Sequence, residues 1–330
     1  GCHPFILNRL NEINFEKISG YGCDEICKSA KEKIRAACDC PNAEIHFLVG
    51  GTQTNATVID ALLKRYETVI TANTGHITEH EAGAIEAKGH KVTMLPSHEG
   101  KISCDDLLAF LKNYFDDENN AHIVRPGVVY ISFPTEFGTI YSLDELKSLR
   151  KVCDEYNLKL YLDGARLGYG LSASSDVTLK DIAKYCHAFY IGGTKVGAMF
   201  GEAVVFTEEN LVPHFFTLIK QNGALLAKGW LLGVQFDTLF TDDLYFKISD
   251  NAIKMAKRIE QAFVQKGYKI FIDSPTNQKF IVLENSKMQE LKKSVSFSYW
   301  QKFDENHTVV RFATSWATTD EQVDELLRLI

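Results

Sequence analysis

One lysine in the sequence has surroundings that suit covalent chemistry. Lys195 follows a short apolar run, Ala188 to Ile191, and lies in the stretch Gly192-Gly193-Thr194-Lys195-Val196-Gly197. A lysine is strongly hydrated and seldom ends a buried strand without a reason, and flanking glycines let a flat ring approach the backbone closely. This pattern predicts a lysine that forms a Schiff base with an aldehyde cofactor. A surface lysine in a glycine-rich turn is the alternative.

An aspartate lies at the end of another expected strand. The run Leu158 to Leu162 alternates apolar and polar residues, and Asp163 follows it directly. Ligands collect at the carboxyl ends of strands in open α/β sheets. A carboxylate there can keep the pyridine nitrogen of pyridoxal phosphate protonated, so that the ring accepts electrons from a breaking bond. An Asp that caps the next helix is an equally good interpretation.

A loop of small residues lies between a third strand-like run and a helix-like run. Residues 44–49 lead into Gly50-Gly51-Thr52-Gln53-Thr54, and residues 56–66 lead out. Free backbone N–H groups and the positive end of a helix make such a loop a phosphate site. The loop lacks both the nucleotide P-loop pattern and Gly-x-Gly-x-x-Gly, which argues against a nucleotide or dinucleotide ligand. An ordinary turn with a helix cap is the alternative.

Two further segments carry groups that suit an amino-acid substrate. In the segment 74–84, His76 can stack on a cofactor ring, and Glu81 can orient it or accept protons. Arg311 lies within the apolar run 309–313, where a buried guanidinium fits a substrate carboxylate bidentately. The alternatives are an acidic first turn of a helix and an edge-strand arginine with its head in water.

In chain order, these segments resemble the aspartate-aminotransferase-like (fold type I) pyridoxal 5′-phosphate enzymes. Longer strings are similar to the low-specificity threonine aldolases, in the family of aromatic amino acid β-eliminating lyases and threonine aldolases. These strings are Gly-Gly-Thr-Gln-Thr-Asn at 50–55, Gly-His-Ile-x-x-His-Glu-x-Gly-Ala at 75–84, Leu-Asp-Gly-Ala-Arg-Leu at 162–167 and Thr-Ser-Trp-Ala-Thr at 314–318. The resemblance covers nearly the whole chain.

The resemblance implies a role for each matched residue. The implied cofactor contacts are Lys195, Asp163, His76, Gly51, Thr52, Gln53, Thr194, Arg166 and Lys228. The implied substrate contacts are Arg166, Arg311, Thr135 and Glu136. Family members build each site at the face of a dimer, so Lys228 or Lys220 is expected to reach the phosphate of a neighbour in a homodimer or tetramer. A short segment that usually precedes the His3-Pro4 pair is also expected to contribute to the site.

The implied reaction is retro-aldol cleavage of threonine, allo-threonine or a related β-hydroxy-α-amino acid to glycine and an aldehyde. The enzyme would therefore be a carbon–carbon lyase. A base must remove the β-hydroxyl proton, and His76, His80, Glu81 and a bound water are the candidates. A β-eliminating lyase acting on an aromatic or hydroxy amino acid is the main alternative. An aminotransferase and a cofactor-holding protein without turnover are the others.

Composition excludes several other classes. The 330 residues carry a net charge of −7, with 45% hydrophobic and 24% charged residues, as is ordinary for a globular protein. There is no basic footprint for nucleic acid, and no apolar run approaches the roughly 20 residues that span a bilayer. The eight scattered cysteines lack the usual zinc spacing, which favours reduced thiols, a cytoplasmic location and no metal site.

The elements that carry these motifs predict an α/β fold. Seven strand-like runs alternate with helix-like runs between residues 44 and 206, which indicates a mostly parallel sheet with helices on both faces. Ser142-x-x-Glu145 and Thr319-x-x-Gln322 predict helix starts, and residues 218–239 predict one long helix. We expect an N-terminal segment, 1–15, packing with the small domain, a large cofactor-binding domain, 16–240, and a small α+β domain, 241–330.

Overall fold

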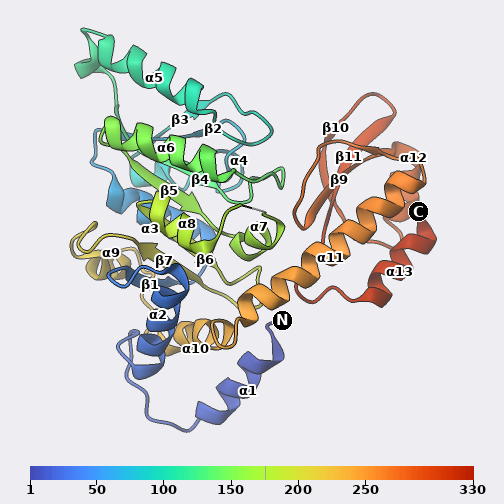
Figure 1. Cartoon of the computed structure of the whole chain (residues 1–330), viewed down its shortest axis with the longest axis horizontal. Helices are drawn as coiled ribbons and strands as arrows, with labels where there is room; N and C mark the ends of the chain where they lie inside the picture. Colours follow the sequence, from blue (N-terminus) through green and yellow to red (C-terminus); the bar gives the residue numbers. More distant parts are fainter. Residues whose placement is uncertain (175) are drawn as a thin grey trace.

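The computed structural model describes residues 1–174 and 176–330. Seven strands form one sheet in the order β1-β7-β6-β5-β4-β2-β3 (Figure 1). They are β1 Glu44–Leu48, β2 Glu67–Ala72, β3 Lys91–Leu95, β4 Arg125–Ser132, β5 Lys159–Asp163, β6 Ala188–Gly192 and β7 Glu202–Phe206. β2 to β6 are parallel, and β7 runs antiparallel to both β6 and β1. The mostly parallel sheet is confirmed, and each strand-like run forms one of its strands.

Helices cover both faces of this sheet because its strands carry apolar side chains on both. Ile131 and Leu162 face one layer, and their neighbours Tyr130 and Tyr161 face the other. The first layer contains α2 Glu25–Cys38, α5 Cys104–Asp116, α6 Leu143–Glu155, α8 Leu179–Tyr185 and α10 Trp230–Leu239. The second contains α3 Gly51–Leu62 and α9 Phe215–Gln221. Short 3₁₀ helices span Glu86–Lys88 and Asn120–His122.

Side-chain caps decide where two helices begin. Ser142 and Glu145 form a capping box before α6, and Thr319 and Gln322 form one before α13 (Asp320–Leu329), so both predicted starts are confirmed. The single helix predicted over 218–239 is wrong: α9 ends at Gln221, and α10 begins at Trp230. The break follows from Gly223, whose φ of +66° reverses the chain and ends α9.

A second, antiparallel sheet lies at the far end of the long helix α11, Leu244–Gln265 (Figure 1). Its order is β10-β11-β9-β8, and its strands are β8 Lys269–Ile270, β9 Gln278–Glu284, β10 Ser298–Lys302 and β11 His307–Ala313. Met255 and Phe263 of α11 pack with Ile281 and Val310 of the sheet, beside α12 (Asn285–Leu291) and α13. The proposed domain boundary at 240 falls just before α11.

The first helix, α1 (Pro4–Ile13), packs on α10. His3, just before it, donates its backbone N–H to the Gly197 carbonyl at 2.8 Å, and its ring lies 5.6 Å from that of Trp316. The start of the chain therefore joins the β6–β7 turn to the C-terminal region. Among the described helices, none combines the length and the apolar character needed to cross a membrane.

Candidate active site

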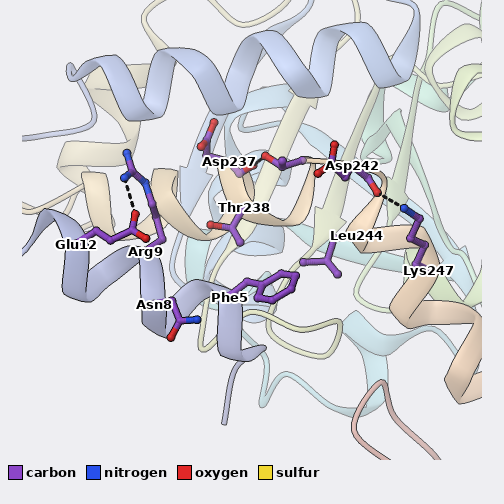
Figure 2. Close-up of a pocket in the computed structure, with 10 residues that line it drawn as sticks. Phe5, Asn8, Arg9, Glu12, Asp237, Thr238, Asp242, Leu244 and Lys247 are labelled. Atoms are coloured by element: carbon purple, nitrogen blue, oxygen red, sulfur yellow. Dashed lines mark hydrogen bonds and ion pairs between the residues drawn. The ribbon is translucent and has the colours of Figure 1, made fainter.

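Several cavities of the described structure have the size of a small-molecule site. One of about 540 Å³ lies at the small sheet and is lined by none of the predicted site residues, so two others are compared. The first, of about 590 Å³, lies between α1 and the α10–α11 junction (Figure 2). Its charged groups are exposed or half-buried and satisfy each other locally: Arg9 pairs with Glu12 at 2.9 Å, and Lys247 donates to the Asp242 carbonyl at 2.6 Å. The other, of about 450 Å³, is lined by Lys195 among other predicted residues. We identify this second cavity as the candidate active site.

The second cavity lies where the parallel strands end, which explains why distant segments meet there. Its lining residues from the large sheet are Asn73, Thr74, His76, Glu79 and His80 after β2, Glu136 and Phe137 after β4, Arg166 after β5 and Lys195 after β6. The small sheet closes the cavity with Tyr299, Trp300 and Gln301 of β10 and Arg311 of β11. The site therefore depends on both sheets.

Asp163, the last residue of β5, is a buried carboxylate with several donors. The Tyr130 hydroxyl donates to its Oδ2 at 2.6 Å, the Tyr190 hydroxyl to its Oδ1 at 2.5 Å, and the Asn55 amide to Oδ2 at 2.9 Å. Burial favours the neutral acid, but the nearby His76 and these hydrogen bonds outweigh it and hold the pKa of Asp163 below its ordinary value. Asp163 is therefore a fixed negative charge under the cavity.

The residues that hold Asp163 were missed by the sequence interpretation. Tyr130, Tyr161 and Tyr190 lie on the adjacent strands β4, β5 and β6 and point to the face covered by α3. The Tyr161 hydroxyl donates to Asn55 Oδ1 at 2.9 Å, which orients the Asn55 amide toward Asp163. The available signal was one tyrosine inside each of three buried strands, because a buried phenol needs a hydrogen-bond partner.

The short helix α4, His76–Glu79, presents His76 to the cavity. Its Nδ1 lies 2.8 Å from Oε1 of Glu81, which also accepts the Asn55 amide at 2.7 Å. Burial lowers the pKa of His76, but the Glu81 hydrogen bond and the charges of Asp163 and Glu81 raise it above its ordinary value. The Glu81 side chain is fully buried and does not line the cavity, so its geometry supports an orienting role.

His80 follows α4 and lines the cavity directly. Its ring centroid lies 5.5 Å from that of His76. Burial, followed by the charge of His76, lowers the pKa of His80 below its ordinary value. The imidazole is therefore neutral at pH 7 and can accept a proton.

Lys195 lies in the turn between β6 and β7, and its carbonyl accepts the Tyr169 hydroxyl at 2.5 Å. Within the described part of the chain, its amine has no carboxylate within 4.0 Å. Burial and the Arg166 guanidinium lower the pKa of Lys195, whereas Asp163 raises it in part. A lysine with a depressed pKa exposes more neutral amine, the form that attacks a carbonyl.

Two arginines line the cavity from opposite sheets. Arg166 comes just before α7 (Leu167–Ala173), and Arg311 lies on β11. Arg311 donates to Gln278 at 3.0 Å, lies 5.5 Å from the Trp300 ring centroid, and has a buried Nε with no partner among the described residues. Burial and the neighbouring Arg166 lower the pKa of Arg311 to about 10. Two close guanidiniums call for an anion between them, and a carboxylate fits.

The predicted phosphate loop lies beside Asp163. α3 begins at Gly51 without a side-chain cap, so the N–H groups of Gly51, Thr52 and Gln53 have no partner within the helix. A Cβ on Gly51 would lie 3.2 Å from the Tyr190 hydroxyl, which itself donates to Asp163. The start of α3 therefore offers an anion site close to a buried carboxylate.

Three other predicted residues differ in their placement. Glu136 lines the cavity, accepts the Ser132 hydroxyl at 2.8 Å, and has a pKa raised by burial to about 7. Thr135 is buried, pairs with the Thr139 hydroxyl at 2.6 Å, and is not among the lining residues. Lys228 is exposed and does not line the cavity of its own chain.

Aromatic residues of the wall were also missed by the sequence interpretation. Phe137 and Trp300 pack edge to face at 5.3 Å, and Tyr299 beside them is 60% exposed. Thr194, next to Lys195, accepts the Gly201 N–H at 3.0 Å and so closes the turn that carries the lysine. The strand β10 gave no sequence signal because an exposed edge strand lacks an apolar alternation.

This chain is similar to several known proteins along most of its length. The β-eliminating lyase family profile matches residues 7–286. A low specificity L-threonine aldolase of Pseudomonas aeruginosa is 28% identical, over 99% of this chain and 94% of its own length. The solved structure of Leishmania major threonine aldolase is 39% identical, with a TM-score of 0.96, over 100% of this chain and 95% of that chain.

A more distant structure shares the fold alone. Thermus thermophilus aspartate aminotransferase is 12% identical, with a TM-score of 0.71, over 99% of this chain and 87% of its own. The predicted aspartate-aminotransferase-like, fold type I architecture is therefore confirmed. With these matches, the chain belongs to the β-eliminating lyase family, in its threonine aldolase group.

Proposed function

We propose that this chain binds pyridoxal 5′-phosphate and cleaves threonine, allo-threonine or a related β-hydroxy-α-amino acid to glycine and an aldehyde. One observation carries the proposal: the Lys195 amine shares a cavity with two guanidiniums, those of Arg166 and Arg311, close to the ionised Asp163. The reaction is chosen because relatives from Pseudomonas aeruginosa and Leishmania major are named threonine aldolases.

The residues present fit the proposed cofactor. The uncapped start of α3, with Gly51, Thr52 and Gln53, offers N–H donors to a phosphate, and the hydroxyl of Thr54 in the same turn is buried without a partner among the described residues. Asp163 suits a protonated ring nitrogen, and His76 suits the ring face. When bound, pyridoxal phosphate supplies an electron sink for the pair released from the broken Cα–Cβ bond.

The arginines would bind and orient the substrate. Arg166 and the unpartnered Nε of Arg311 would bind its carboxylate, and this contact fixes how the remaining substituents of Cα are directed. Glu136, whose pKa lies near 7, would hydrogen-bond the polar groups of the substrate on the same side as Arg166. Trp300 and Phe137 would shield the substrate from water.

His80 would take the proton of the β-hydroxyl, directly or through one water molecule. It is neutral at pH 7 and lines the cavity. His76 is less suitable because its Nδ1 is bound to Glu81 and its ring is expected to stack on the cofactor. Glu81 is buried behind that ring. This assignment gives each of the three candidates a different task.

The test is an absorbance spectrum of the protein reconstituted with pyridoxal phosphate, followed by addition of L-allo-threonine with detection of acetaldehyde and glycine. A visible band in wild type but not in Lys195→Ala, together with acetaldehyde, is the expected result. Pyruvate and ammonia from serine or tyrosine, without acetaldehyde, would instead establish the β-eliminating lyase. Keto-acid-dependent amino transfer would establish an aminotransferase. A persistent band in Lys195→Ala would overturn the assignment of the lysine.

We also propose that the chain is a cytoplasmic homo-oligomer whose active sites lie at a dimer face. The eight cysteines are free thiols in this structure, which supports a reducing compartment. The exposed Lys228 has no role in the cavity of its own chain, which supports its predicted reach toward the phosphate site of a partner subunit. No contact with nucleic acid or membrane enters the proposal.

A further inference from the structure

A further buried carboxyl lies under the turn that carries the lysine, and the proposed mechanism does not use it. Glu202 begins β7, pairs with Gly192 of β6 and Leu48 of β1, and is 3% exposed. Its Oε2 accepts the N–H of Gly193 at 3.0 Å. The hydroxyl of Thr194 also hydrogen-bonds to its carboxyl. One side chain thus binds the two residues that precede Lys195.

The backbone around Glu202 is already tied to the same turn. The N–H groups of Gly193 and Thr194 donate to the Gly201 carbonyl at 3.0 and 3.1 Å, and the Gly201 N–H donates to the Thr194 hydroxyl at 3.0 Å. Backbone groups, the Thr194 hydroxyl and the Glu202 carboxyl therefore hold the turn together. The Glu202 carboxyl adds a titratable group to it.

The groups that face Glu202 are one lysine, one carboxylate and three phenols. Lys195 and Asp163 interact with it electrostatically, as do Tyr161 of β5, Tyr190 of β6 and Tyr245 of α11. Burial raises the pKa of all three phenols far above neutrality, so they stay uncharged. Lys195 is the cation in this set, and a negative charge on Glu202 favours its protonated form.

We propose that Glu202 is a positioning residue for Lys195, whose carboxyl supports the lysine turn and whose ionisation holds a proton on the Lys195 amine. The expected effect of Glu202 on the capture of pyridoxal phosphate rests on the proposed function. Burial raises the pKa of Glu202 to about 8, against the opposing effect of its hydrogen bonds and of Lys195. The carboxyl is therefore neutral at pH 7 and leaves the amine free to lose its proton, whereas above pH 8 its negative charge favours the protonated amine through space.

The first test measures unfolding of the apoprotein in urea at several pH values, for wild type and Glu202→Gln. The folded pKa is raised above the unfolded one, so the folded state binds more protons between about pH 4.5 and 8, and the stability from this group is lost as pH rises through that window. The unfolding equilibrium constant of wild type should therefore rise with pH more steeply than that of Glu202→Gln. The ratio of the variant's constant to that of wild type should fall by up to about tenfold for each unit of pH increase. Parallel pH profiles would overturn the proposal.

The second test follows capture of pyridoxal phosphate by the apoprotein, as the rise of visible absorbance at different pH values. Glu202→Gln keeps an oxygen for the Gly193 N–H but removes the anion, so the half-maximum of the capture rate should move about one pH unit lower. Glu67→Gln is the matched control, since Glu67 is also buried and accepts the Lys64 N–H at 2.8 Å far from the cavity. Its profile should coincide with that of wild type.

The outcomes separate this proposal from the proposed function. Capture by wild type with an unshifted Glu202→Gln profile would overturn the role of Glu202 and leave the cofactor assignment standing. If Glu202→Gln does not fold, infrared spectroscopy of a Glu136→Gln background decides. A protonated-carboxyl band present at pH 7 and lost as pH rises through 8 supports the proposal, and the absence of that band at pH 7 overturns it.

Discussion

At the scale of single residues, the site is defined by which carboxyls are charged. Asp163 receives hydrogen bonds from two phenols and an amide and is ionised, whereas Glu136 and Glu202 lack such a set of donors and have pKa values near 7 and 8. The charge of the nearby His76 also favours the ionised form of Asp163, so this charge and the donors together make the difference. A fixed charge and two carboxyls that titrate near neutrality therefore lie in or beneath the cavity, and Glu136 is the one of the three that lines it.

Replacing Asp163 by Asn should reduce kcat for threonine cleavage by about 10²–10³, the usual effect of removing one preorganised charge. An amide cannot keep the ring nitrogen protonated, although it preserves size. Steady-state kinetics, with cofactor content checked by absorbance, measures the effect. Tyr161→Phe is the control, because Tyr161 donates to Asn55 and not to Asp163, and it should cost much less. Equal losses in the two variants would contradict the assignment.

Replacing His80 by Gln should lower kcat by about 10²–10⁴ at pH 7.5, as expected for a lost general base. In wild type, the base must be neutral, and the pKa of His80 lies below its ordinary 6.5, so kcat should fall only as the pH drops below that value. In the variant, kcat should no longer show this fall at low pH, which is the acid limb of the pH profile. Glu79→Gln, at a neighbouring position of the same wall, should retain it. A limb unchanged in His80→Gln would assign the base elsewhere.

At the scale of elements, β10 forms one wall of the cavity although it belongs to the edge of the small sheet. The Trp300 ring centroid lies 5.5 Å from the Arg311 guanidinium and helps to orient it. Trp300→Ala should therefore weaken substrate binding by about 0.5–2 kcal/mol. That loss corresponds to a rise in KM of about 2- to 30-fold with little change in kcat. Tyr299→Ala, at an exposed neighbour, is the control and should change KM less.

Gly164 directly follows β5, and the neighbouring strand β6 leaves no room for a side chain at this position. A Cβ on Gly164 would lie 1.9 Å from the Tyr190 carbonyl oxygen, so Gly164→Ala should destabilise the protein by about 1–3 kcal/mol through overpacking. Urea unfolding of the apoprotein measures this. Gly50→Ala is the control, since nothing lies within 4 Å of that Cβ, and it should change stability by less than about 0.5 kcal/mol. Equal effects would show that strand packing does not limit this position.

The sequence predicted the elements whose residues alternate or cap, and it failed where tertiary contacts decide. The seven strands of the large sheet have apolar cores, and the helix at Ser142 has its own capping box, so both could be predicted. Strand β10 is mostly polar and exposed, and its pairing with β11 comes from elsewhere in the chain. Lys195 and Asp163 each follow an apolar run, so their positions after buried strands could be predicted. The phenols around Asp163 could not, because their convergence depends on the register of three paired strands.

At the scale of the whole molecule, the prediction for Lys228 concerns two chains. Consider a dimer in which one chain carries Lys228→Ala and the other carries Lys195→Ala. If Lys228 serves the partner's site, this dimer has one active site with both substitutions and one intact active site. An equal mixture, refolded together, should then regain about a quarter of wild-type activity. Acetaldehyde release against the two separate variants measures this. No gain over the separate variants would place Lys228 outside the partner's site.

The edge position of β10 also has a consequence for how this protein can diversify. Its side chains are mostly exposed, so changes there remove little from the core, yet Tyr299, Trp300 and Gln301 border the substrate. Asp163 and its phenols, by contrast, lie inside the main sheet. Substrate range and cofactor chemistry are thus encoded in parts of the molecule with very different tolerance to mutation. A library confined to positions 298–301 should change which aldehydes are released while the variants keep folding.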